Sequence, residues 1–235
     1  MKIFIPMAGK GTRLRPFTLT CPKPLINILD KPIVEHLIDQ ITSKVKSNID
    51  EIVYILGDES YFNAEVVNSL NIISEKYNAK TKIYRQLEQL GTGHAIMCAE
   101  ESLSGPSIIA YADTMIQGNI EIDTQVDGIM WVKKVDNPSA YGVVNLDNEN
   151  KITELIEKPA EFISDLAVVG IYYFKEAANL RGYLRKHLSE KLSPGKEYLL
   201  NYGIEKMIKN GDSFVPKEID IWMDCGTPEL LLNST

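Results

Sequence analysis

The sequence of 235 residues predicts an α/β protein with a Rossmann-like, mostly parallel mixed sheet flanked by helices and a later β-rich portion. In the first half, short runs rich in Ile, Val and Tyr alternate with segments whose apolar residues recur at helical spacing. Such βαβ alternation implies a mostly parallel sheet covered by helices. From about residue 126 onward, β-like runs follow one another with few helices between them, which predicts a mixed sheet folding back onto the first half.

Strands of the first half are predicted where β-branched and aromatic residues cluster, and helices where apolar residues recur three or four positions apart. The predicted strands are Lys2–Met7, Glu51–Leu56, Thr81–Arg85 and Ser107–Tyr111. The predicted helices are Ile33–Val45, Tyr61–Tyr77 and His94–Ser102. Pro32 suits the start of the first helix, where its missing N–H costs no hydrogen bond.

The second half is predicted by the same rules. Its strands are Gly128–Lys134, Tyr141–Leu146, Ile152–Ile156, Ala167–Phe174, Ser213–Pro216 and Asp220–Met223, and its helices are Glu176–Leu188 and Tyr198–Lys209. NLDNENKI, Asn145–Ile152, has the composition of a hairpin turn. We expect one domain over residues 1–235. The final TPELLLNST fits either a frayed terminus or a cut before a further C-terminal domain after residue 235.

The composition is that of an ordinary soluble globular protein and narrows the range of partners. No apolar stretch approaches the roughly 18 residues needed to span a bilayer, so we expect no membrane association. The net charge of −7 argues against binding to nucleic acid. Three isolated cysteines, Cys21, Cys98 and Cys225, form no CxxC pair, which favours a reducing, cytoplasmic location.

Positive charge is concentrated at the start of this acidic chain. Residues 1–31 carry six Lys and Arg side chains and one acidic side chain. Four of the six lie in PMAGKGTRLRPFTLTCPKP, Pro6–Pro24, next to the first predicted strand. Glycines after a strand let backbone N–H groups approach a phosphate, so the segment predicts an anion site. The alternative is a chance cluster of solvated charges.

Two common phosphate-binding motifs do not fit this segment. A P-loop requires GxxxxGK[ST], which no stretch of the chain supplies. A dinucleotide fingerprint requires GxGxxG, and GKGTRL lacks the last glycine. In addition, Pro16, Pro22 and Pro24 prevent the continuous helix that should follow such a fingerprint.

The remaining pattern, GTRLRPFT followed by PKPL, resembles the sugar-1-phosphate nucleotidyltransferases, or nucleotide-sugar pyrophosphorylases. Their signature is GGxGTRLxPLT followed by KP, and Ala8-Gly9 stands here where the family usually has a glycine pair. The resemblance implies that Arg13 binds the triphosphate and that Lys23 binds phosphates near the reacting centre, as catalytic cations. It also assigns nucleotide binding to Ala8, Gly9, Gly11 and Thr12.

YRQLEQLGTGHA, Tyr84–Ala95, resembles the base-recognition segment of the thymidylyl- and uridylyltransferases in this family. Gln86 offers an amide that can donate and accept against a pyrimidine edge, and Gly91 lets the backbone approach the base. Thr92 opens the next helix, although Thr92 and Gly93 also fit a plain helix entry. His94 is expected to pack or cap, because a sugar phosphate is already a nucleophilic dianion at neutral pH.

Two later segments, AYGVV…EKP and LAVVGIYYF, resemble the family's sugar-phosphate site. The residues that the resemblance assigns to sugar-phosphate binding are Tyr141, Gly142, Glu157, Lys158, Val168 and Gly170. Relatives that act on N-acetylglucosamine phosphate usually carry Asn-Thr-Gly at the last of these motifs. Val168 in place of that Asn favours an unacetylated hexose such as glucose. The chain would thus divide into a nucleotide-binding half, 1–125, and a sugar-phosphate-binding half, 126–235.

Two isolated acids are candidate metal ligands. Asp113 follows an apolar run, and Asp224 lies in WMDCGTPE; both match positions of metal-binding aspartates in the family. Mg²⁺ prefers carboxylate and phosphate oxygens, so the implied cofactor is Mg²⁺. Each acid alone would equally fit a loop cap.

The resemblance covers residues 1–230 in order and implies Mg²⁺-dependent nucleotidyl transfer. An NTP, with dTTP or UTP favoured, would react with a hexose 1-phosphate, with glucose 1-phosphate favoured. Family members are commonly oligomers, so a homo-oligomer is a further expectation. Alternatives are a catalytically silent nucleotide-sugar-binding regulator, a glycosyltransferase, for which the expected DxD pair is missing, and a relative with another phosphorylated acceptor.

Overall fold

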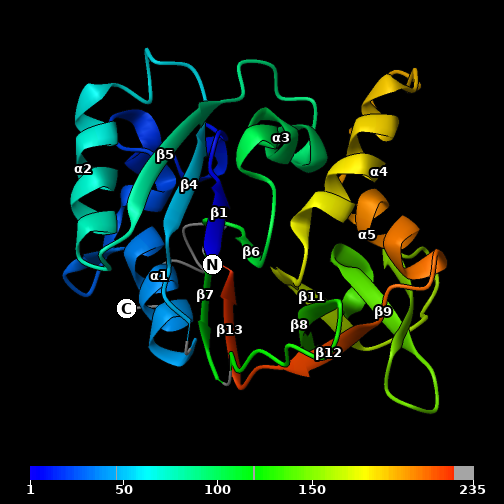
Figure 1. Cartoon of the computed structure of the whole chain (residues 1–235). Helices are drawn as coiled ribbons and strands as arrows, with labels where there is room; N and C mark the ends of the chain where they lie inside the picture. The colour runs from blue at the N-terminus through cyan, green and yellow to red at the C-terminus, as the bar shows by residue number, and fades with distance from the viewer. Residues whose placement is uncertain (46, 119, 225–235) are drawn as a thin grey trace.

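The computed structural model describes residues 1–45, 47–118 and 120–224, with helices on both faces of a central sheet (Figure 1). Within these residues the strand order is β10-β9-β11-β6-β1-β4-β5, and β8 and β12 extend the sheet from β11. The strands are β1 (Lys2–Pro6), β4 (Glu51–Leu56), β5 (Lys80–Arg85), β6 (Ser107–Ala110), β8 (Gly128–Lys134), β9 (Gly142–Leu146), β10 (Ile152–Glu157), β11 (Leu166–Phe174) and β12 (Phe214–Glu218). The helices are α1 (Ile33–Lys44), α2 (Ala64–Glu75), α3 (Thr92–Cys98), α4 (Ala177–Ser189) and α5 (Leu200–Lys209).

The first half of the sheet is parallel and has its switch point beside β1. Strand β1 pairs in parallel with both β4 and β6, and β5 continues beyond β4. The chain therefore builds the sheet outward through β4 to β5 and then returns to the other side of β1. The segments after β1 and β6 leave the sheet at the same edge, where ligands bind in open α/β sheets.

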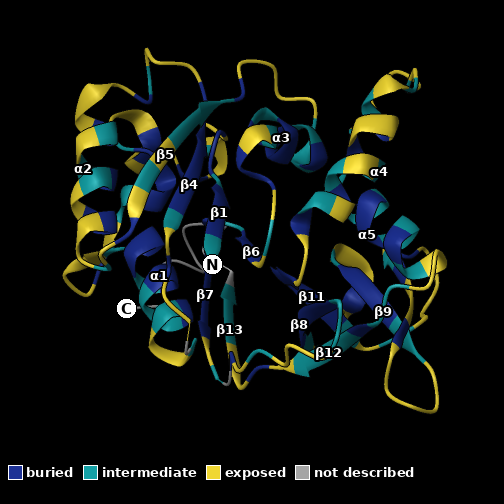
Figure 2. Cartoon of the chain, in the orientation of Figure 1, coloured by how far each residue is buried: buried dark blue, intermediate teal, exposed yellow. Residues whose placement is uncertain are grey.

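Successive side chains of β1 pack into hydrophobic clusters on opposite faces of the sheet. Ile3 and Ile5 pack into the hydrophobic cluster formed with α1 and α2, whereas Phe4 packs into the cluster formed with α3, α4 and α5. All three side chains are fully buried. Figure 2 shows the buried strands between helices whose outer faces are exposed. The loop after β1 thus starts from a rigid point.

The second half of the sheet is mostly antiparallel. Strand β11 pairs antiparallel with β6, β8 and β9, and β9 forms a hairpin with β10. Asn150 lies in the predicted turn of that hairpin and has a φ of 62°. Strand β12 adds to β8 in parallel. The predicted fold class is confirmed, including the β-rich later portion.

Two small sheets accompany the main one. Strands β2 (Asn27–Ile28) and β3 (Lys31–Pro32) form the first, and β7 (Thr114–Gln117) and β13 (Ile221–Asp224) form the second. The apolar run SIIAYADTMI is not one strand, because β6 ends at Ala110 and Asp113 lies in the turn before β7. One continuous apolar run hides this break, and the partner strand β13 comes from the far end of the described chain.

Gly170 shapes the middle of β11. The pairing of β11 with β8 shifts register between Val168 and Tyr172, and Gly170 within this bulge has a φ of 84°. A Cβ atom at position 170 would lie 2.5 Å from Cδ2 of Tyr111, and the Gly170 carbonyl accepts from the Tyr111 N–H at 3.0 Å. The glycine therefore lets the β6–β7 turn pack closely against β11.

We expect Gly170→Ala to lower the free energy of unfolding by about 2–4 kcal/mol, because it combines a left-handed backbone with a steric clash. Gly195→Ala is the matched control, since Gly195 has a φ of 80° but open space around its Cβ position. That control should cost only about 1 kcal/mol. Urea unfolding followed by circular dichroism measures both. Equal losses would show that Tyr111 moves away without cost.

Candidate active site

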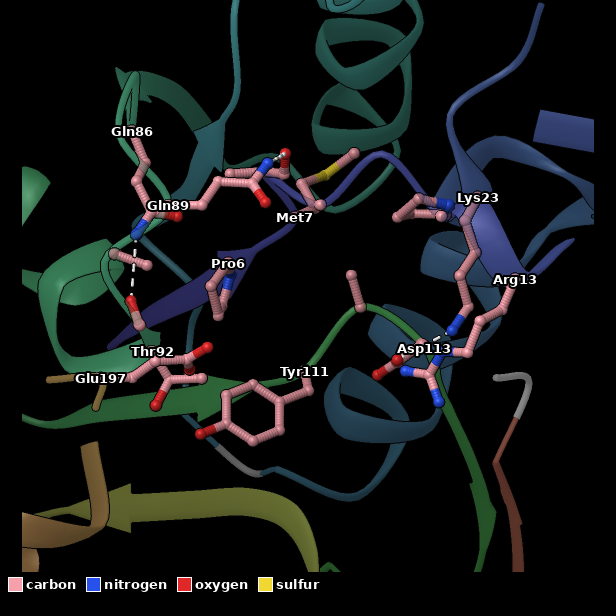
Figure 3. A pocket seen from close by; sticks show the side chains of 17 residues that line it. Pro6, Met7, Arg13, Lys23, Gln86, Gln89, Thr92, Tyr111, Asp113 and Glu197 are labelled. Carbon is pink, nitrogen blue, oxygen red and sulfur yellow. Dashed lines mark hydrogen bonds and ion pairs between the residues drawn. The ribbon is translucent and has the colours of Figure 1, made fainter. Parts of the chain in front are cut away.

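Two adjoining cavities open at the carboxyl ends of β1 and β6. The first has a volume of about 420 Å³ and the second about 220 Å³, and Thr92, Tyr111 and Asp113 line both. The segment after β1 and the segment after β5 form most of the first cavity (Figure 3). The turn after β6, the β-rich half and α5 form most of the second. The site therefore lies at the switch point of the sheet.

The loop after β1 is held in short turns. Gly11 has a φ of 60° and precedes the 3₁₀ helix η1 (Thr12–Leu14), and η2 (Phe17–Leu19) and η3 (Lys23–Leu25) follow. The Thr18 hydroxyl donates to the Gly11 carbonyl at 2.7 Å, and Leu14 is fully buried in a small separate cluster. As the prolines predict, the loop forms no long helix. Ala8, Gly9 and Gly11 line the first cavity.

A buried cation and a carboxylate meet inside the first cavity. The Lys23 Nζ lies 2.8 Å from Oδ2 of Asp113, and Lys23 is only 9% exposed. The Asp113 side chain is 43% exposed, so the carboxylate also faces solvent. Arg13 comes from η1 and lines the same cavity (Figure 3). The arrangement can bind phosphate oxygens through Lys23 and Arg13 and a cation through Asp113.

The segment after β5 forms the opposite wall of the first cavity. Gln86 is 6% exposed, and its Nε2 donates to the Gly91 carbonyl at 3.0 Å and lies 3.0 Å from Nδ1 of His94. Gln89 Nε2 donates to the Ala8 carbonyl at 3.1 Å and ties this wall to the loop after β1. The expectation that Gln86 both donates and accepts toward a ligand needs correction, because its nitrogen is already engaged within the protein.

Gly91 and Gly93 allow a distant segment to pack against this wall. Gly91 has a φ of 116°, and a Cβ atom there would lie 2.6 Å from the Tyr198 carbonyl oxygen. The Gly93 N–H donates to that same oxygen at 2.7 Å, and the Leu200 N–H donates to the Thr92 hydroxyl at 3.0 Å. The segment before α5 is thereby fixed, and its Glu197 lines the first cavity.

The second cavity contains a carboxylate held by an amide. The Asn201 Nδ2 donates to Oε2 of Glu157 at 2.7 Å, and the Asn201 Oδ1 accepts from the Tyr172 hydroxyl at 3.2 Å. A Cβ atom at Gly142 would lie 3.2 Å from the same Glu157 oxygen, so the glycine leaves room for this pair. The other predicted residues that line this cavity are Tyr141, Val168 and Gly170.

Tyr111 connects the two cavities. Its side chain interacts with those of Thr92 and Tyr172, and burial raises the pKa of its hydroxyl to about 12. The hydroxyl therefore stays protonated near neutral pH and can donate a hydrogen bond. Tyr172, Asn201 and Glu157 form a chain of hydrogen bonds, and Tyr111 and Thr92 lie beside it.

Three predicted site residues are placed differently from the rest. The Thr12 side chain is exposed and lines neither cavity. Lys158 follows β10 in a left-handed conformation with a φ of 44°, is exposed and also lines neither cavity. The backbone of Asp224 ends β13, but its side chain lies outside the described part of the structure.

A divalent metal fits the donor set only in combination with a ligand. Within the described residues, no group of three or more His, Cys, Asp or Glu side chains is arranged to hold an ion. The register of β13 on β7 pairs Asp224 with Thr114, the residue after Asp113. One or two carboxylates plus phosphate oxygens are the usual magnesium environment beside a nucleotide. Asp113 is thus an adequate ligand for such a shared ion, and the backbone register brings Asp224 beside the residue that follows it.

Motif reading missed several residues of the site. Gln89, Tyr111, Glu197, Asn201 and Trp222 line the cavities but were not predicted. Gln89 and Tyr111 lie within motifs that were read, so their positions could have been noted. Trp222 also lies within a motif that was read, WMDCGTPE, whereas Asn201 comes from a segment whose local pattern predicts only a helix. Tertiary contact alone brings Asn201 to the site.

This geometry is that of a nucleotide-dependent transferase: a cationic glycine-containing loop at the switch point, a facing carboxylate and an adjoining polar cavity. Residues 4–235 match the family model described as nucleotidyl transferase. The chain therefore belongs to the nucleotidyl transferase family, and the predicted family is confirmed.

Named relatives include two archaeal proteins. The chain is 33% identical over 232 residues to the bifunctional protein GlmU of Methanococcus maripaludis, and the aligned region covers 97% of this chain and 52% of that protein. It is 30% identical over 239 residues to the UTP–glucose-1-phosphate uridylyltransferase AglF of Haloferax volcanii, and the aligned region covers 97% of this chain and 93% of that protein. The chain thus spans about half the length of the GlmU relatives and nearly all of AglF.

Solved structures share the fold. A nucleoside-diphosphate-sugar pyrophosphorylase from Vibrio cholerae superposes with a TM-score of 0.83 at 19% identity, and the match covers 99% of this chain and 98% of the other. A UDP-glucose pyrophosphorylase complexed with UDP-glucose superposes with a TM-score of 0.78 at 23% identity, and the match covers 99% of this chain and 96% of the other.

None of the helices in the described part of the chain has the length and apolar character needed to traverse a bilayer.

We expect Asn201→Ala to lower the free energy of unfolding by about 1–2 kcal/mol, because it removes hydrogen bonds to Glu157 and Tyr172. Asn179→Ala on the exposed face of α4 is the control and should change stability by no more than about 0.5 kcal/mol. Urea unfolding compares the two. A stable Asn201→Ala protein would mean that water replaces the amide without loss.

Proposed function

We propose that this protein catalyses nucleotidyl transfer from an NTP to a sugar 1-phosphate, giving an NDP-sugar and pyrophosphate. The observation that carries the proposal is the convergence of Lys23, Arg13 and Asp113 at the opening of a two-part cavity. One part has cations and glycines suited to a triphosphate, and the other has a fixed carboxylate and amide suited to sugar hydroxyls. Family membership and the near full-length similarity to AglF support the same reaction class.

The reaction needs positioning and charge stabilisation more than acid–base chemistry. A phosphate oxygen of the sugar phosphate attacks the α-phosphorus, the new P–O bond forms, and the bond to the departing pyrophosphate breaks. Lys23 and Arg13 would stabilise the negative charge that accumulates on the phosphate oxygens. Lys23 is buried and already paired at 2.8 Å, so its ammonium is held in place before substrate arrives.

Asp113 and Asp224 would hold Mg²⁺ together with phosphate oxygens of the nucleotide. When bound, the ion supplies positive charge against the triphosphate and helps to align it. Lys23 donates to Oδ2 of Asp113 and neutralises part of the carboxylate's charge. The same carboxylate could thus serve both a lysine and a cation.

The second cavity suits the hydroxyl groups of a hexose. Glu157 offers an acceptor oxygen beside the Asn201 amide, and Gly142 leaves space above them. Lys158 stays the predicted partner of the acceptor phosphate, although its side chain is exposed in this conformation. Val168 presents an apolar wall, which supports glucose 1-phosphate over an acetylated amino sugar.

UTP and dTTP are the favoured nucleotides. Gln86, Gly91 and Thr92 lie together on one wall of the first cavity, as the predicted base segment requires. The relative AglF is named for UTP and glucose 1-phosphate, which supports this pair as the first to test. The cytoplasmic location, the homo-oligomer and the division at residue 125 stay predictions.

The direct test is pyrophosphate release over a matrix of NTPs and sugar 1-phosphates. We expect turnover with UTP or dTTP and glucose 1-phosphate in the presence of Mg²⁺ and its loss when EDTA removes the ion. Glucose 6-phosphate is the control acceptor and should not support release. Absence of turnover over the whole matrix, with nucleotide binding retained, would favour a silent regulatory protein instead.

Lys23→Met should lower kcat/KM by about 100-fold or more, because it removes a fixed cation from the charge that develops in the transition state. Lys31→Met makes the same change in net charge at a site outside both cavities. Its kcat/KM should stay within about threefold of the wild-type value, since exposed charges are screened by salt. Steady-state pyrophosphate release measures both variants. Similar losses in the two would refute a local role for Lys23.

A further inference from the structure

Both N–H groups of the Gln86 amide are committed within the protein. Its Nε2 donates to the Gly91 carbonyl at 3.0 Å and lies 3.0 Å from Nδ1 of His94. A backbone carbonyl can only accept, so the nitrogen of the amide, not its oxygen, must face Gly91. The buried Gln86 side chain therefore has only Oε1 free for another partner.

His94 can accept from Gln86 only in one form. Nδ1 must carry a lone pair, which places the single ring proton of neutral histidine on Nε2. Burial lowers the pKa of His94, and a hydrogen bond to the backbone of Glu88, together with the Glu88 charge, acts in the opposite direction.

The position of His94 is set by tertiary contacts. The residue lies in the first turn of α3, and the Tyr198 carbonyl accepts from the N–H groups of Gly93 at 2.7 Å and His94 at 3.4 Å. The ring is half-buried against the wall of the first cavity. Gln86 and His94 are thus held together by contacts within the protein.

We propose that His94 is a positioning residue that makes Gln86 a pure hydrogen-bond acceptor toward the nucleobase and thereby selects uracil or thymine against cytosine. This inference rests on the proposed function, which places the base at this wall. Uracil and thymine carry an N–H at N3, whereas unprotonated cytosine carries a lone pair there. An acceptor oxygen on Gln86 attracts the N3–H of uracil or thymine and repels the N3 lone pair of cytosine. Without His94, one amide N–H of Gln86 is released and can face the base.

The test compares kcat/KM for UTP and CTP in pyrophosphate release, with glucose 1-phosphate and Mg²⁺. The wild type should prefer UTP by about tenfold or more, the discrimination expected of one buried hydrogen bond. His94→Ala removes the acceptor and should reduce the UTP/CTP ratio by about tenfold. His94→Asn should retain the ratio, because its Oδ1 lies near the position of the histidine Nδ1. His94→Leu should behave as His94→Ala does and replaces it if the smaller side chain impairs folding.

His36→Asn is the matched control, since His36 also makes one hydrogen bond, from Nε2 to the Ile28 carbonyl, at 2.7 Å, but lines neither cavity. Its UTP/CTP ratio should equal that of the wild type. An unchanged ratio in folded His94→Ala or His94→Leu, an equal collapse in His94→Asn, or a wild type without base preference would each overturn the inference. A wild type that turns over no NTP would overturn the proposed function and this inference with it.

Discussion

The parallel pairing of β1 with β6 is the constraint on which the site depends. Neighbouring parallel strands end at the same edge of a sheet, so the segments that follow them must meet there. Lys23 arrives in this way from the loop after β1, and Asp113 arrives from the turn after β6. Fully buried side chains on both faces of β1 prevent the strand from shifting. The 2.8 Å contact between Lys23 and Asp113 follows from this arrangement.

The segment before α5 adds a second constraint by joining the two cavities. Glu197 lines the first cavity and Asn201 lines the second, and the Tyr198 backbone between them packs against Gly91 and accepts a hydrogen bond from Gly93. A shift of this segment would therefore alter both walls together. The glycines are required here because any side chain would meet the Tyr198 backbone. The two cavities thus share one structural support.

The sequence predicted the elements better than their partners. Strong β-branched runs located β4 and β8 correctly at both ends, because burial on two faces leaves a clear local pattern. The sequence pattern did not reveal β7, whose partner strand β13 lies far along the chain. Cations and glycines of the first loop were recognised because their pattern is local. Asn201 was not, since its contact with Glu157 joins two elements by tertiary packing.

Charge compensation explains how a buried lysine can be kept ready for a phosphate. A lysine that is only 9% exposed would be costly without a partner for its charge, and Asp113 offsets that cost. The Asp113 side chain stays accessible to solvent, whereas the Lys23 side chain is buried. When a triphosphate arrives with a cation, the phosphate can replace Asp113 as the partner of Lys23, and the cation can replace Lys23 as the partner of Asp113. Under the proposed function, binding exchanges one set of ion pairs for another and leaves neither Lys23 nor Asp113 buried alone.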